Sequence, residues 1–134
     1  MKLNIQQFGG RGASSNINHN FKIHTMEQGN FEGQTYKTKL IRNNSGQVTG
    51  ELNYVINSDG EAMVRMIKVY DQYKRQGYAT KLLRDLQKEV GDRDINFDML
   101  TDDGKALINK IGIITQERKG VYGVSHYKGR IKLK

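Results

Sequence analysis

The stretch 63–83 constrains the fold of this chain most, because it joins a strand to a helix through a short turn that contains a glycine. The apolar run 63–70 is typical of a buried strand, and an amphipathic helix follows it closely. Gly77 and Ala79 stand in the expected first turn of that helix. The first N–H groups of a helix have no intrahelical partner, and the helix dipole adds positive potential there. The turn therefore predicts an anion site, and we expect a pyrophosphate.

Basic side chains around this turn strengthen the prediction. Lys74, Arg75 and Lys81 flank Gly77, and the chain carries a net charge of +8 from 22 basic and 14 acidic residues. Such an excess favours polyanionic partners, which include phosphorylated cofactors and nucleic acid. The charge is spread along the chain, as on a solvated surface, and this argues against nucleic acid. A glycine in this place also has a simpler alternative role, which is to let the backbone turn.

The composition excludes several kinds of site. A chain of 134 residues is expected to form one domain, and without cysteine it has no disulfide, thiol nucleophile or thiolate metal site. Its three histidines are scattered, so we expect no bound metal. It has no apolar run of membrane-spanning length and no apolar signal segment. We therefore expect a cytoplasmic protein without a membrane partner.

Alternation of apolar and polar residues predicts a mostly antiparallel sheet. Strands are expected at residues 21–26, 36–41, 48–56 and 61–70, with a loop at 29–33 and turns at 43–46 and 57–60. A helix is expected over 76–90, ended by Gly91, and a fifth strand over 95–99. This strand–helix–strand crossover favours one parallel pair.

The last third of the chain predicts a second helix and a hairpin. Thr101 is expected to cap the helix, which has Ala106, Leu107, Ile108 and Ile111 on its apolar side and stops at Gly112. A closing hairpin is expected from strands 113–116 and 121–127 around a turn at 118–120.

Residues 1–20 are predicted to be a flexible or partner-bound tail, and residues 21–134 to be the folded domain. The tail is small and polar and too poor in apolar residues to order itself. Its segment Phe-Gly-Gly-Arg-Gly-Ala-Ser-Ser, residues 8–15, resembles the amino termini of several tailed-phage head-region proteins. That resemblance implies a phage origin and a phage structural protein as a partner of residues 1–20.

The order of elements, together with residues 67–83, resembles the GNAT superfamily of acetyl-CoA-dependent N-acetyltransferases. Gly77 and Ala79 match its pattern Arg/Gln-x-x-Gly-x-Gly/Ala, and Lys74 holds the first place. The resemblance covers about residues 21–127, without the usual helical pair between the first two strands, because residues 28–34 are too few. It implies an α+β fold with a mixed, mostly antiparallel sheet, a central helix after strand four and a second helix after strand five.

The same resemblance implies acetyl-CoA as the cosubstrate. Its pyrophosphate would lie in the backbone N–H groups of residues 76–79, and its pantetheine arm would pair with the main chain of Ile67 and Val69. A backbone N–H near Val69 would polarise the thioester carbonyl. Asp103 stands where the family often has an asparagine that contacts the arm. The residues expected to bind the cofactor are Ile67, Lys68, Val69, Lys74, Arg75, Gln76, Gly77, Tyr78, Ala79, Thr80 and Asp103.

Acetyl transfer to an amine also needs a proton acceptor. A lysine-like amine of pKa ~10.4 lies about 3.4 units above pH 7, which is roughly 4.6 kcal/mol, so a general base is expected to help. Ile108 stands where many family members hold a tyrosine acid, and an aliphatic side chain cannot protonate a thiolate. The candidate bases are Glu61, Asp98 and Glu51, and the candidate acids are Tyr122, Tyr78 and Tyr127.

These predictions favour an N-acetyltransferase that moves the acetyl group of acetyl-CoA directly to an amine of a protein or small molecule. Direct transfer is expected because no cysteine could carry a covalent intermediate. The alternative is a catalytically inactive GNAT-like binding or structural module in the phage head or virion, which Ile108 and the short connection support. A basic nucleic-acid-binding domain is the third hypothesis. The expected location is the host cytoplasm or, for the structural module, the virion.

Overall fold

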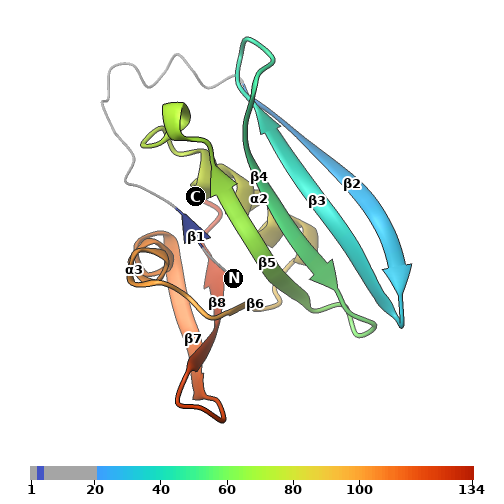
Figure 1. Cartoon of the computed structure of the whole chain (residues 1–134), viewed down its shortest axis with the longest axis vertical. Helices are drawn as coiled ribbons and strands as arrows, with labels where there is room; N and C mark the ends of the chain where they lie inside the picture. The colour runs from blue at the N-terminus through green and yellow to red at the C-terminus, as the bar shows by residue number, and fades with distance from the viewer. Residues whose placement is uncertain (1–2, 5–20) are drawn as a thin grey trace.

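The computed structural model describes residues 3–4 and 21–134. The fold is α+β, with two α-helices packed on an open, mostly antiparallel sheet (Figure 1). The strands lie in the order β2-β3-β4-β5-β6-β8-β7, and β1 pairs with β5 beside this path. The predicted fold class is confirmed at this level.

The four long strands form an antiparallel meander. They are β2 (Lys22–Phe31), β3 (Gln34–Arg42), β4 (Val48–Ile56) and β5 (Ala62–Val69). The loop predicted at 29–33 is wrong, because β2 runs on to Phe31 and turns through Glu32 and Gly33. Their φ angles are 52° and 79°, and a two-residue hairpin turn with two positive φ angles matches the twist of the strands.

The crossover after β5 contains a short 3-10 helix, η1 (Asp71–Tyr73), and then α2 (Tyr78–Val90). α2 begins two residues later than predicted, because Gly77 has φ 83° and therefore lies outside the right-handed helix, at a position where it has no side chain to cap it. Leu82, Leu83 and Leu86 are fully buried on its sheet side. The next strand, β6 (Ile95–Asp98), runs parallel to β5, which confirms the predicted parallel pair.

The second helix, α3 (Asp102–Ile111), is capped as predicted, since the Thr101 hydroxyl accepts a 3.0 Å hydrogen bond from the Gly104 N–H. Ala106 is exposed, so its expected place on the apolar side is wrong. The closing hairpin consists of β7 (Gly112–Lys119) and β8 (Ser125–Ile131). Its turn lies at 120–124 and not at 118–120, because the Gly120 N–H donates to the Val124 carbonyl and Gly123 takes φ 79°.

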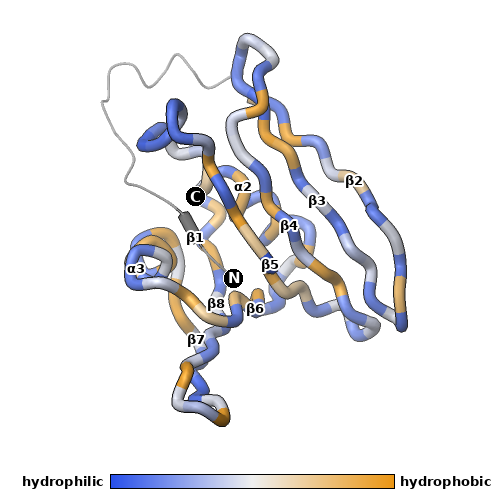
Figure 2. The backbone as a smooth tube through the Cα atoms, in the orientation of Figure 1, coloured by the Kyte–Doolittle hydropathy of each residue, from blue (hydrophilic) through white to orange (hydrophobic). Residues whose placement is uncertain are grey.

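One apolar core lies between the sheet and the helices, and the apolar stretches of the central strands follow it (Figure 2). Among the described residues, neither helix has both the length and the apolarity that are needed to cross a membrane. The largest buried side chains of the core include Tyr54, Phe97, Ile41, Leu52, Ile67, Leu82, Leu83, Leu86, Ile95 and Ile108.

A buried lysine fixes the carboxyl-terminal half of α2 to the sheet. Lys39 of β3 is only 2% exposed, and its Nζ lies 2.8 Å from both Asp85 Oδ2 and Glu89 Oε1 of α2. A buried cation is tolerated only when it is paired and hydrogen-bonded, as Lys39 is here. This cluster therefore sets the position of α2 along β3 and β4.

Glu89 is the centre of this cluster. Its carboxylate accepts hydrogen bonds from Lys37 Nζ and from the Tyr54 hydroxyl. Burial alone would raise the pKa of Glu89, but the hydrogen bonds from Lys37, Lys39 and Tyr54 outweigh it and lower the pKa to about 2. Burial, and then the hydrogen bond to Glu89, raise the pKa of Tyr54. Glu89 therefore stays ionised throughout the physiological range of pH.

The first strand, β1 (Leu3–Asn4), joins the sheet from the amino terminus. It pairs with β5 in parallel, with Leu3 opposite Ile67 and Asn4 opposite Lys68. It also lies next to α3 (Figure 1). The boundary predicted at residue 20 therefore does not separate these two residues from the domain, and the rest of the predicted tail lies outside the described residues.

Candidate functional site

The two parallel strands β5 and β6 meet at one point and then part. Within the described residues a single register pair, Met63 with Asn96, joins them. β6 ends two residues later at Asp98, whereas β5 continues to Val69. The carboxyl-terminal half of β5 therefore presents an edge that β6 does not cover (Figure 1).

This edge carries the main-chain groups of Ile67 and Val69. The Tyr70 N–H donates to the carbonyl of Thr49 in β4, so the main-chain groups of Tyr70 are directed towards β4. Because successive residues of a strand direct their N–H and C=O groups to opposite edges, Val69 and Ile67 direct theirs away from β4. Their side chains are buried in the core, so contacts at this edge are made by the main chain, and β1 pairs there opposite Ile67 and Lys68.

The amino terminus of α2 lies in the same crossover and is uncapped. Gly77 supplies no side chain, and no described side chain caps this end, whereas Thr101 caps α3. The N–H groups of Tyr78, Ala79 and Thr80 in the first turn therefore have no intrahelical acceptor. The predicted small-residue helix start is present, and such a start attracts anions.

A groove of about 480 Å³ runs beside this helix end, with Gly77 and Thr80 in its wall. Lys81 Nζ lies there, 5.2 Å from the centre of the Phe21 ring. Among the described residues no carboxylate pairs with Lys81. Burial, and then the nearby Arg84 guanidinium, lower the pKa of Lys81. The groove therefore combines apolar walls with a cation that a phosphate would stabilise.

The other predicted cofactor residues have separate surroundings. Lys74 Nζ lies 3.1 Å from Asp71 Oδ1, and the Lys68 ammonium lies over the Tyr70 ring. Arg75 has φ 68° and is exposed, as is Gln76. Asp103 is exposed on the first turn of α3. The structure thus brings residues 67–69 and 74–80 into one crossover, and it places Asp103 on a different helix.

Of the candidate bases, Asp98 lies at the strand divergence. Its Oδ1 lies 2.5 Å from His126 Nδ1 on β8, and its backbone takes φ 60°. Positive φ in a residue other than glycine stores strain and is common at functional sites. Sequence reasoning missed His126, which is 28 residues away in the chain; no local signal joins the two residues, and only the β6–β8 pairing could have revealed them.

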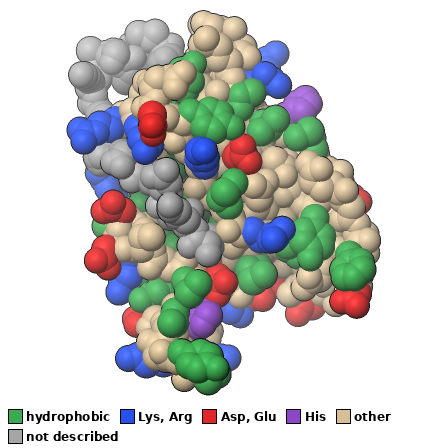
Figure 3. Space-filling model, viewed as in Figure 1, with side chains coloured by type: hydrophobic (Ala, Val, Ile, Leu, Met, Phe, Trp, Pro, Cys, Tyr) green, Lys and Arg blue, Asp and Glu red, His purple; other side chains and the backbone are tan. Residues whose placement is uncertain are grey.

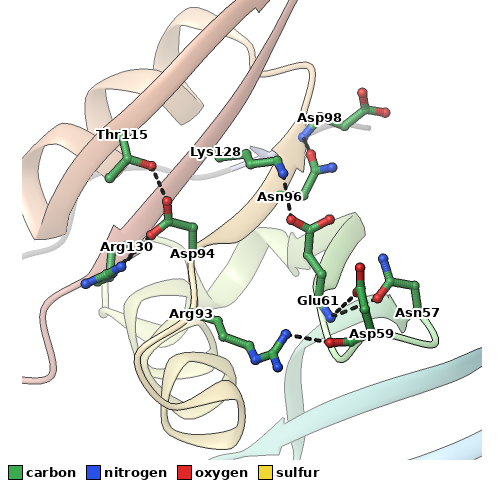
Figure 4. A network of polar contacts seen from close by, with 10 residues as sticks. All are labelled: Asn57, Asp59, Glu61, Arg93, Asp94, Asn96, Asp98, Thr115, Lys128 and Arg130. Atoms are coloured by element: carbon green, nitrogen blue, oxygen red, sulfur yellow. Dashed lines mark hydrogen bonds and ion pairs between the residues drawn. The ribbon is translucent and has the colours of Figure 1, made fainter.

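Glu61 lies on the closed side of the divergence, before the first residue of β5. Its Oε2 accepts a 2.7 Å hydrogen bond from Lys128 Nζ, and the Asp98 carboxylate points away from this pair (Figure 4). Glu51 accepts a 2.9 Å hydrogen bond from the Tyr70 hydroxyl. All three carboxylates are thus paired within the protein, and Asp98 differs from the other two by its place at the end of β6, where the strands diverge.

Of the predicted acids, Tyr122 lies farthest from the core. It is 91% exposed at the end of the β7–β8 hairpin, where hydrophobic side chains gather at the surface (Figure 3). The Tyr127 hydroxyl accepts a 3.4 Å hydrogen bond from Lys105 Nζ. Burial, and then Tyr73, raise the pKa of Tyr78, which lines the start of α2. Ile108 is fully buried in the core.

Comparisons with protein-family models, with curated proteins and with solved structures found no match. The described residues contain no group of three or more His, Cys, Asp or Glu side chains that could hold a metal ion. The candidate functional features of the described residues are the β5 edge, the α2 end and the Asp98–His126 pair.

Proposed function

We propose that this chain binds acetyl-CoA and transfers the acetyl group to an amine. The observation that carries the proposal is the parting of β5 and β6 next to the uncapped start of α2. A pantetheine arm contains amide groups and can pair with the β5 edge at Ile67 and Val69, as a strand would. The diphosphate can accept hydrogen bonds from the free N–H groups after Gly77.

The groove supports the same ligand at its nucleotide end. Coenzyme A is strongly anionic, and the groove beside Gly77 is lined by three cationic side chains and one carboxylate, which are Lys81, Arg84, Lys88 and Asp85. Phe21 and Ile23 provide an apolar wall, against which a base can pack. A ligand with phosphates and an apolar body therefore fits this surface better than an inorganic anion does.

The reaction needs only groups that lie around the divergence. The amine nitrogen attacks the thioester carbonyl, the new C–N bond forms, and the C–S bond breaks to release the thiolate of coenzyme A. The Val69 N–H stabilises the negative charge that develops on the carbonyl oxygen. Asp98 accepts the proton from the amine, and His126 holds the Asp98 carboxylate in place.

Isothermal titration calorimetry with acetyl-CoA tests the binding step. The Gly77→Glu variant places a carboxylate and a side chain at the proposed diphosphate site, and we expect it to abolish binding. Gly46→Glu is the matched control, because Gly46 has φ 85°, close to the 83° of Gly77, and stands in a turn with open space around it. If the wild-type protein and both variants bind acetyl-CoA equally and have the same circular dichroism, Gly77 does not lie at a diphosphate site.

Turnover is tested by release of the coenzyme thiol in the presence of a panel of amines. The panel should contain free lysine, lysine peptides, polyamines and aminoglycosides, since the acceptor is an amine of unknown size. A thiol signal that depends on both acetyl-CoA and one amine supports the transferase.

A catalytically inactive module is the second candidate, and two observations favour it. The place of the tyrosine acid is held by the buried Ile108, and Leu3 and Asn4 occupy the β5 edge at Ile67 and Lys68. Acetyl-CoA binding without turnover on any amine would support this candidate. Co-sedimentation with phage particles tests whether the module is a component of the particle, and with it the proposed phage origin.

A further inference from the structure

The β5 edge proposed for the pantetheine arm is already paired in this structure. Leu3 lies opposite Ile67 and Asn4 opposite Lys68, in parallel. On the same edge, β6 pairs through Met63 alone, nearer the start of β5. β1 therefore pairs with the same edge farther along β5, beyond the point where β6 leaves it.

Two partners cannot share one stretch of a strand edge. Each residue directs its N–H and its C=O to one edge only, and the next residue directs its groups to the opposite edge; a paired strand lies about 4.8 Å from its neighbour and fills that edge. The opposite edge of β5 is fully used by β4, which pairs from Ala62 to Val69. The acyl arm therefore has no second place along Ile67 and Lys68.

The pairing of β1 is short. Among the described residues two of β1 pair with β5, whereas β4 pairs with β5 from Ala62 to Val69 with one register shift. Short, terminal elements open at low free energy, because few hydrogen bonds and little apolar area are lost. β1 can therefore leave β5 without unfolding of the sheet.

We infer that Leu3–Asn4 is a built-in competitor of the acyl arm, so that β1 must leave β5 before acetyl-CoA can bind fully. This inference rests on the proposed function and adds regulation to the same site. The competitor and the ligand share their chemistry, since both are extended chains that present amide N–H and C=O groups to the β5 edge. The apparent affinity for acetyl-CoA is then the intrinsic affinity multiplied by the fraction of molecules in which β1 is absent from the edge.

The test uses the full chain with Leu3→Pro and Asn4→Pro together. Successive residues face opposite edges, so one of the two N–H groups of β1 faces β5. The double substitution removes that donor whichever residue carries it, and it disfavours the pairing of β1. We expect faster amide hydrogen exchange at Ile67 or Val69, and tighter acetyl-CoA binding, by roughly tenfold if β1 is docked in about nine of ten molecules. Asn18→Pro is the control, with the same type of substitution in the same amino-terminal segment, and both measurements should match those of the wild-type protein.

A second measurement needs no substitution. In the wild-type protein, saturating acetyl-CoA should accelerate exchange of the β1 amide that faces β5, which is that of Leu3 or of Asn4, and slow exchange of the Ile67 or Val69 amide. Two outcomes would contradict the competition while the proposed function stands. In the first, the β1 amide that faces β5 stays protected at saturating acetyl-CoA. In the second, the double proline variant opens β1 but binds acetyl-CoA with the affinity of the wild type. If neither protein binds acetyl-CoA, the proposed function fails and the competition fails with it.

Discussion

Asp98 Oδ1 lies 2.5 Å from Nδ1 of His126, and this contact links the end of β6 to the neighbouring strand β8. Asp98 also donates its backbone N–H to Asn96 Oδ1 and takes φ 60°. The position of Asp98 is thus fixed by one contact of its side chain and one of its backbone. A base must be held in this way if it is to meet a substrate in one geometry.

The first prediction concerns this pair. Asp98→Asn keeps a residue that tolerates positive φ and removes the negative charge. We expect kcat to fall about 100-fold with the dissociation constant of acetyl-CoA unchanged, as measured by thiol release and calorimetry. Asp92→Asn, at an exposed position after α2, should leave kcat unchanged. A normal kcat in Asp98→Asn would show that Asp98 is not the base and that another group or water accepts the proton.

The second prediction concerns the cation in the groove. Lys81→Met keeps most of the side-chain length and removes the ammonium, so phosphate groups lose an attraction inside a partly buried groove. We expect acetyl-CoA to bind about tenfold more weakly, equivalent to about 1.4 kcal/mol. Lys119→Met, on the exposed end of β7, is the control for the loss of one positive charge. Equal weakening by both substitutions would mean that net charge alone attracts the ligand.

The third prediction is a pH dependence of stability. The pKa of Glu89 is about 2 in the folded protein and near its ordinary value of about 4.3 in the unfolded chain. Its contribution is therefore present above about pH 5 and is lost as the pH falls towards 2, on the order of 2 to 3 kcal/mol. Urea denaturation of the wild type and of Glu89→Gln should differ at pH 7 and converge near pH 2. A difference that is constant with pH would contradict the assigned cause.

The fourth prediction concerns the buried lysine. Lys39→Met leaves the carboxylates of Asp85 and Glu89 without their buried cation, and removal of one partner of a buried pair costs about 3 to 5 kcal/mol. The midpoint of urea denaturation should fall accordingly. Lys22→Met, on the exposed part of β2, should change the midpoint little. If acidification to pH 3 restores the lost stability of Lys39→Met, repulsion between the two carboxylates is the cause.

Local patterns predicted much of the fold. The strand at 48–56 agrees with β4, because alternation and the turns at Gly46 and Gly60 fix both of its ends. Thr101 was identified as a cap because its hydroxyl acts within its own turn. The hairpin turn was misplaced, since Gly120 and Gly123 both suit a turn and only the pairing of Lys119 with Ser125 selects between the alternatives.

Features that depend on distant parts of the chain were not predicted. A strand of two residues, such as Leu3–Asn4, shows no alternation, so nothing in the sequence marks it as the neighbour of Ile67. His126 was dismissed as an isolated histidine, because its contact with Asp98 arises only when β8 pairs with β6. No periodicity in the sequence encodes the parting of β5 and β6, which depends on where each of the two strands ends.

The two ends of α2 will respond differently to ionic strength. At the carboxyl-terminal half the Lys39 ammonium is buried and its two carboxylate partners are partly buried, and dissolved ions screen such a pair less than they screen exposed charges. The start of the helix at Gly77 is open to solvent, and added salt will compete there for any anion. A salt titration can therefore separate ligand capture from folding in this protein, since the first should decline well before the helix loosens from the sheet.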